Sequence, residues 1–175
     1  MGLTAAQITH SLDAVAAKEP AIARALAAAG YPEPRIRERG YVTLLRAIVG
    51  QQVSVAAAAS MWRKLENELG PDIPAADLLA RDFDNLPEDD EEAIALLTRI
   101  KGIGRWTAEI YLLFAEGRPD IWPAGDLAVQ AGLCKILGLD ARPTEKETRA
   151  LAEDWRPHRG ATAIFTWHCY NNPAL

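Results

Sequence analysis

Cysteine is scarce in this sequence, with only Cys134 and Cys169 among 175 residues. Two thiols cannot supply the four thiolates that an iron–sulfur cluster needs, which excludes a cluster-bearing protein. A disulfide is not required either, because a chain of this length with 49% apolar residues can form a sizeable core without one. We expect both cysteines to be buried packing residues.

The sequence also lacks an apolar run of about 18 residues, the length that a membrane-spanning helix needs. Its first fifteen residues include His10 and Asp13, which interrupt the apolar stretch of a signal peptide. We therefore expect a cytoplasmic protein with no membrane partner. Its histidines and cysteines show no zinc-like spacing, so no metal site made of side chains is expected.

An excess of basic residues is missing as well. The chain has 19 lysines and arginines against 24 aspartates and glutamates, a net charge of −5. This weighs mildly against a nucleic-acid partner, because basic groups drive phosphate binding. However, the acidic residues crowd positions 82–92, whereas Arg99, Lys101 and Arg105 surround one short glycine-containing segment. Each charge run is also consistent with an ordinary solvated surface.

Helical periodicity dominates the sequence, and no alternating strand pattern exceeds a few residues, which predicts an all-α fold. Thr4 with Gln7, and Thr144 with Glu147, have the form of capping boxes. The predicted helices begin at Thr4, at residue 21, at Tyr41, after a cap at Ser54, within the acidic residues 88–92, near Trp106, at Asp126 and at Thr144, and a last one contains Ile164 to His168. We expect the helix from Thr144 to end at Arg156 and Pro157.

Residues 99–114 read RIKGIGRWTAEIYLLF, two helix-like runs joined by a tight Gly-x-Gly turn. The N–H groups that begin a helix carry partial positive charge, and glycines let a phosphate approach them without a Cβ in the way. On a convex tip, the N–H groups near Gly102 to Arg105 suit one backbone phosphate of DNA rather than an enclosed nucleotide. A plain helix–helix turn is equally consistent with this pattern.

Three motifs in one order carry a more specific resemblance: LLRAIVGQQVSVAAA, IKGIGRWTAEIYLLF and WPAGD. Together they resemble the helix-hairpin-helix superfamily of DNA glycosylases, and within it the AlkA-type 3-methyladenine DNA glycosylase II enzymes. The resemblance extends from about Tyr41 to His168. It implies a two-lobed helical fold that binds double-stranded DNA containing a damaged base, with that base flipped out between the lobes.

This resemblance also implies the domain organisation. We expect one glycosylase domain over residues 1–175. Residues of about 36–86 would form one lobe, about 87–140 would carry the hairpin and the catalytic aspartate, and 1–35 with 141–175 would pack around them. Between Gly70 and Leu86 the chain is shorter than the family pattern. A separate N-terminal β domain, which some AlkA-type enzymes have, is not expected, since residues 1–35 read as helix and linker.

By the same resemblance Asp126 falls on the catalytic aspartate of the family. Breaking the N-glycosidic bond to an alkylated purine creates an oxocarbenium-like sugar, while the cationic base leaves as a neutral molecule. One carboxylate that stabilises the sugar cation can therefore suffice. From local sequence alone a helix N-cap is the stronger interpretation of Asp126, and the resemblance reverses that order. The two roles are compatible, because helix N–H groups favour a negative charge.

Trp106 occupies a position that divides the superfamily. In members that also cut the DNA strand, this position holds a lysine that forms a Schiff base with the sugar. A tryptophan cannot do so, and we expect no lyase activity. The resemblance implies instead that Trp106 and Trp167 stack on the damaged base, where indoles attract cationic purines. It adds Ile110, Leu127 and His168 to this base pocket.

The aromatic assignments have plainer alternatives. A tryptophan at helical spacing more often belongs to the core, and an isolated histidine such as His168 is more typical of a structural role. We assign Trp62, Trp122 and Trp155 to the core.

The resemblance places DNA contacts in two loops. Gln52, next to Gln51, matches the residue that the family inserts into the gap left by the flipped base, although both glutamines could equally cap helix ends. The contacts implied around the hairpin are Lys101, Gly102, Ile103, Gly104, Arg105 and Thr107. The family's hairpin often holds a monovalent cation, Na⁺ or K⁺, through backbone carbonyls, here those of Thr98, Ile100 and Ile103. No other cofactor is expected.

These observations predict a monofunctional glycosylase for alkylated purines, monomeric, cytoplasmic and associated with the nucleoid. A non-catalytic helix-hairpin-helix DNA-binding protein is the first alternative. The second is a glycosylase for deaminated or oxidised bases. Such neutral leaving groups need a second proton donor, which the sequence does not reveal.

Overall fold

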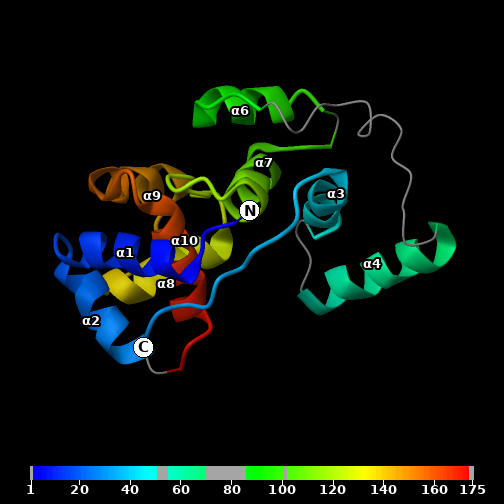
Figure 1. The fold of residues 1–175 in the computed structure, drawn as a ribbon. Helices are drawn as coiled ribbons and strands as arrows, with labels where there is room; N and C mark the ends of the chain where they lie inside the picture. The colour runs from blue at the N-terminus through cyan, green and yellow to red at the C-terminus, as the bar shows by residue number, and fades with distance from the viewer. Residues whose placement is uncertain (1, 51–54, 70–85, 101, 174–175) are drawn as a thin grey trace. The chain divides into compact units, whose positions relative to one another are not determined.

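Every regular element in the described part of the protein is a helix, which confirms the predicted all-α fold (Figure 1). The computed structural model describes residues 2–50, 55–69, 86–100 and 102–173. The predicted cap at Ser54 lies outside these ranges, and so does the shortened segment up to residue 85. None of the helices within them is both long and apolar enough to cross a lipid bilayer.

The chain divides into two compact units, each described by itself. We call residues 37–116 the hairpin unit, and residues 2–36 with 117–175 the aspartate unit. The sequence-based organisation grouped the hairpin with Asp126 in one segment of about 87–140. In the structure this segment is divided between the two units, because the chain after Gly117 packs against the terminal helices.

Among its described residues the hairpin unit contains α3 (Tyr41–Val49), α4 (Val55–Leu69), α6 (Asp90–Leu97), α7 (Arg105–Tyr111) and the π-helical turn η1 (Leu112–Glu116). Its core is formed where α3 and α6 pack on α7, with Leu44, Leu97 and Tyr111 fully buried. The carboxylate of Asp89 accepts the N–H of Glu92 and begins α6. The predicted acidic helix start at 88–92 is therefore confirmed.

The extended segment before α3 is tied to α7 and η1. The Arg37 N–H donates to the Phe114 carbonyl at 2.9 Å, and the Gly40 N–H donates to the Tyr111 hydroxyl at 3.1 Å. Arg39 forms an ion pair with Glu116 at 2.9 Å. These contacts hold the beginning of the unit against its end.

The aspartate unit consists of α1 (Ala5–Ala16), α2 (Pro20–Ala29), α8 (Leu127–Leu137), α9 (Glu145–Leu151), the 3-10 turn η2 (Glu153–Trp155) and α10 (Arg159–Tyr170). Helix α10 is central: it packs on α8, α1 and α2, and most of its residues are buried. Ile8, Leu12, Leu133 and Phe165 are fully buried between these helices. Both predicted capping boxes are present, at Thr4 and at Thr144.

Two predictions about this unit need correction. The helix that starts at Thr144 ends at Leu151 rather than near Arg156, and η2 follows. The tighter turn accompanies burial of Trp155, whose ring meets that of Trp122 edge to face at 5.8 Å. Cys134 is partly exposed rather than buried, because it lies in the last turns of α8, whereas Cys169 is buried. The core assignments of Trp122 and Trp155 are confirmed, as is that of Trp62 in α4 of the hairpin unit.

Candidate DNA-binding hairpin and candidate catalytic aspartate

The hairpin between α6 and α7 turns at Gly102, whose φ of 91° is readily available only to glycine. The Ile103 N–H donates to the Ile100 carbonyl at 3.0 Å and closes the turn. Gly104, with an extended backbone, precedes α7 and brings no capping side chain. The structure thus forms the predicted Gly-x-Gly elbow, with both glycines exposed.

Gly104 is informative because the protein itself does not require a glycine there. Its φ of −88° suits any residue, and a Cβ built on it has no heavy atom of the described residues within 4 Å. Internal packing and backbone strain therefore give no reason for glycine at this position. Open space over the backbone is what an external group needs for close approach.

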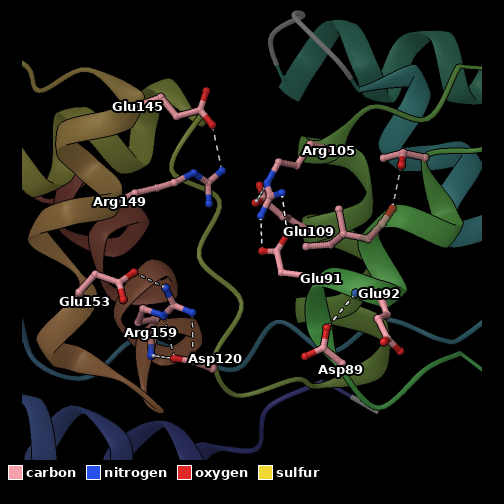
Figure 2. Close-up of polar contacts among 12 residues, drawn as sticks. Asp89, Glu91, Glu92, Arg105, Glu109, Asp120, Glu145, Arg149, Glu153 and Arg159 are labelled. Carbon is pink, nitrogen blue, oxygen red and sulfur yellow. Dashed lines mark hydrogen bonds and ion pairs between the residues drawn. The ribbon is translucent and has the colours of Figure 1, made fainter.

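Arg105 is engaged within the hairpin itself. Figure 2 shows its guanidinium between Glu91 at the start of α6 and Glu109 in α7. Arg105 Nη1 and Nε each lie 2.9 Å from a carboxylate oxygen, of Glu91 and Glu109 respectively. Hydrogen bonding to Glu91, with the charge of both carboxylates, raises the pKa of Arg105. The side chain holds α6 to α7, and a phosphate would compete with two carboxylates for it.

The other residues predicted in this unit differ in accessibility. Trp106 and Ile110 are partly exposed and lie one turn apart on the same face of α7, so the structure brings these two together. Thr107 is fully buried, and its side chain is not on the surface. Ile103 is also buried. Lys101, Gln51 and Gln52 lie outside the described residues.

The predicted cation ligands belong to the same turn. The Ile100 carbonyl already accepts the Ile103 N–H, and a carbonyl oxygen has a second lone pair available. Backbone carbonyls are the kind of ligand that Na⁺ or K⁺ takes, and the site at Thr98, Ile100 and Ile103 stays a prediction. Within the described ranges, no three His, Cys, Asp or Glu side chains are grouped so that they could hold a metal.

Asp126 is the N-cap of α8, as the local sequence predicted. Its Oδ1 accepts the N–H groups of Ala128 at 2.8 Å and Val129 at 2.9 Å. The same oxygen accepts the indole N–H of Trp167 at 3.1 Å. Trp167 belongs to α10 and is only 7% exposed. The sequence suggested Trp167 as a stacking surface and did not indicate this hydrogen bond, which joins residues 41 positions apart.

The loop that leads to Asp126 is anchored to the beginning of α10. Asp120 accepts hydrogen bonds from Arg159 Nε at 2.9 Å and Nη2 at 2.7 Å (Figure 2). Arg156 Nη1 donates to Asp120 at 2.7 Å, and the Gly160 N–H donates to the Pro119 carbonyl at 2.7 Å. The loop is therefore held to α10 at its start through Asp120 and at its end through Asp126.

The remaining predicted pocket residues also belong to the aspartate unit. Leu127 follows Asp126 directly and is 61% exposed. His168 Nε2 lies 2.9 Å from the Ala29 carbonyl at the end of α2, and its ring stacks on Phe165. These contacts agree with the structural interpretation of His168.

This chain belongs to the HhH-GPD superfamily of base excision DNA repair proteins, whose family model matches residues 45–158. It is 42% identical over 77 residues to DNA-3-methyladenine glycosylase 1 of Schizosaccharomyces pombe, which covers 44% of this chain and 34% of that protein. The predicted resemblance is therefore confirmed. The matches to the first curated relatives span only 27 to 37% of their length.

Solved structures agree with this assignment. The Schizosaccharomyces pombe 3-methyladenine DNA glycosylase Mag1, in complex with abasic DNA, superposes with a TM-score of 0.76 at 25% identity, covering 90% of this chain and 95% of that one. A DNA-3-methyladenine glycosidase from Bacillus halodurans has a TM-score of 0.70 at 19% identity, covering 93% and 87%. At 19% identity, the likeness to the Bacillus halodurans structure supports only a shared fold.

Proposed function

We propose that this protein is a monofunctional DNA glycosylase, which hydrolyses the N-glycosidic bond of alkylated purines such as 3-methyladenine and 7-methylguanine in base excision repair. The observation that carries the proposal is the carboxylate of Asp126, held at the start of α8 by two backbone N–H groups and by the Trp167 indole. Membership of the HhH-GPD superfamily and the likeness to 3-methyladenine glycosylases support it.

The reaction requires stabilisation of positive charge more than it requires an acid. As the bond between sugar C1′ and the purine nitrogen breaks, the sugar gains oxocarbenium character and the cationic base leaves as a neutral molecule. Water then adds to C1′, loses a proton and leaves an abasic site. A single carboxylate at Asp126 can stabilise the sugar cation and orient this water. Because protein N–H groups already orient the carboxylate, little reorganisation accompanies the step.

The hairpin is the proposed phosphate anchor. The exposed backbone at Gly102 and Gly104 suits a phosphate, and the open space over Gly104 is accounted for by close approach of DNA. Arg105 takes part only when its ion pair with Glu91 opens. The anchor is therefore assigned to the backbone N–H groups of the turn rather than to the arginine.

Double-stranded DNA with a damaged base is the proposed partner, and a monomer the proposed binding form. Gln51 and Gln52 are the proposed contacts to the gap and to the orphaned base. The chemistry needs no cofactor, and Na⁺ or K⁺ on the carbonyls of Thr98, Ile100 and Ile103 would neutralise charge between hairpin and phosphate. Since the substrate is chromosomal DNA, the proposed location is the cytoplasm, at the nucleoid.

Trp106 is the proposed stacking surface for the cationic base, because it is partly exposed and its indole can form a cation–π contact worth about 1 to 2 kcal/mol. Ile110, one turn away on the same face of α7, is proposed to contact the base as well. Leu127 and His168 of the aspartate unit stay predicted pocket residues, although the contacts of His168 favour its structural role. Trp167 has little exposed surface left for a base. Since Trp106 cannot form a Schiff base, the product is an intact strand with an abasic site.

The test is a base-release assay on duplexes that each carry one lesion: 3-methyladenine, 7-methylguanine, hypoxanthine or 8-oxoguanine. We expect release of the methylated purines without strand cleavage, and loss of at least a hundredfold in rate for Asp126→Asn. The variant should bind abasic-site DNA as tightly as the wild type does. Salt-dependent DNA binding without release of any base would favour a non-catalytic DNA-binding protein. Preferred release of hypoxanthine or 8-oxoguanine would favour a glycosylase for deaminated or oxidised bases.

A further inference from the structure

A partly buried hydrogen bond links the proposed catalytic carboxylate to a helix that is distant in sequence. The indole N–H of Trp167, in α10, donates to Asp126 Oδ1, the oxygen that also accepts two N–H groups of α8. The α8 donors alone would satisfy an ordinary N-cap. The third donor comes from a different helix, so the orientation of the carboxylate depends on how α8 and α10 pack.

The packing of these helices depends on a glycine in α8. A Cβ added at Gly132 would lie 2.1 Å from the Thr166 carbonyl oxygen and 2.8 Å from its carbonyl carbon. Both atoms belong to the backbone of α10 and cannot move aside as a flexible side chain would. Only glycine allows this approach, and Thr166 directly precedes Trp167. Gly132 therefore sets the separation at which the indole reaches Asp126.

We propose that Trp167 is a positioning residue for Asp126, and that the contact between Gly132 and Thr166 sets the length of this hydrogen bond. The proposal rests on the proposed function, because a positioned carboxylate affects a rate only in an enzyme. It assigns Trp167 to the orientation of the carboxylate, whereas stacking on the base is assigned to Trp106. A displacement of about 1 Å in a catalytic group can lower a rate about a hundredfold.

The central variant is Trp167→Phe, which removes the N–H and keeps an aromatic ring. We expect kcat, measured with enzyme in excess over a 7-methylguanine duplex, to fall about tenfold to a hundredfold. Affinity for abasic-site DNA should stay within about threefold, since no DNA contact is removed. Gly132→Ala should lower kcat in the same direction, by separating α8 from α10.

Trp122→Phe is the matched control. Trp122 is also buried, at 3% exposure, but its indole N–H donates to the Thr148 carbonyl at 3.0 Å. Loss of this N–H should lower stability as Trp167→Phe does, while kcat stays within about threefold of wild type. Equal kcat in the two variants would overturn the positioning role.

A second measurement does not depend on activity. The side-chain N–H resonance of Trp167, assigned by its disappearance in Trp167→Phe, should shift when Asp126 is changed to Asn, because the charged acceptor is lost. An unmoved resonance would overturn the positioning proposal. A wild-type protein that releases no base would instead overturn the proposed function, even where the resonance moves. The two failures are thus distinguishable.

Discussion

Asp120 and Arg159 form a two-pronged ion pair that is largely removed from solvent. Arg159 Nε and Nη2 lie 2.9 and 2.7 Å from the two carboxylate oxygens of Asp120, and the side chains are 10% and 15% exposed for Arg159 and Asp120. The pair joins the loop before Asp126 to the first turn of α10. Because both charges are nearly buried, each needs a charged partner for compensation, and Asp120 is the main partner of Arg159.

Replacement of Asp120 by Ala should therefore destabilise the protein by about 2 to 3 kcal/mol, since it leaves the Arg159 guanidinium without its main partner. The weaker contact of Arg159 with Glu153, at 3.3 Å, limits the loss. Urea unfolding measures the change. The control is Arg149→Ala, which breaks the more exposed pair with Glu145 and should cost less than about 0.5 kcal/mol. Equal losses in the two variants would contradict the importance of the buried pair.

Arg105→Ala tests whether this arginine holds the hairpin or binds phosphate. Glu109 is only 2% exposed and loses a charged partner, so we expect a loss of about 1 to 2 kcal/mol in unfolding free energy. The slope of log affinity for abasic-site DNA against log salt should stay unchanged. Arg99→Ala, at an exposed position, should leave stability unaffected. A salt slope smaller by about one at unchanged stability would show that Arg105 binds phosphate.

Gly104→Ala tests whether the glycine is required for stability or for DNA binding. A Cβ at this position has no heavy atom within 4 Å among the residues that the structure describes, so the unfolding free energy should change by less than about 0.5 kcal/mol. The methyl group would stand between a phosphate and the backbone N–H groups, and affinity for abasic-site DNA should fall by about tenfold. Fluorescence anisotropy measures this affinity. Unchanged affinity would contradict the role of the hairpin as the phosphate anchor.

The two cysteines should differ in reactivity. Burial raises the pKa of the Cys169 thiol to about 12, which the positive charge of Lys135 only partly offsets. At pH 8 the thiolate fraction of Cys169 is then on the order of one in ten thousand, and this form is the reactive one. Iodoacetamide should label the partly exposed Cys134 in the native protein and leave Cys169 unlabelled. Mass spectrometry locates the label, and comparable labelling of both residues would contradict burial of Cys169.

The sequence predicted those features that depend on neighbouring residues. The capping boxes at Thr4 and Thr144, the acidic start of α6 and the turn at Gly102 each involve side chains within a few positions, so local patterns indicate them. The cap of α8 by Asp126 is of the same kind. The resemblance to helix-hairpin-helix glycosylases rests on motifs that combine such local features, which explains why the family could be predicted.

The contacts that position the candidate site could not be predicted in this way. The hydrogen bond from Trp167 to Asp126 spans 41 residues, and the pair of Asp120 with Arg159 spans 39. The close approach of Gly132 to the Thr166 backbone gives no local signal, because a glycine within a helix indicates only a low helix propensity. The early end of α9 follows from burial of Trp155, a tertiary effect that overrides the helical pattern.

The cap of α8 also makes the state of the carboxylate observable without DNA. The amide hydrogens of Ala128 and Val129 donate to Asp126 Oδ1, because the first N–H groups of a helix have no carbonyl acceptor within the helix. Their exchange with solvent deuterium requires the carboxylate to leave its position. Because the indole of Trp167 holds the same oxygen, slow exchange at these two amides would report how rarely the aspartate moves, on the timescale of local opening.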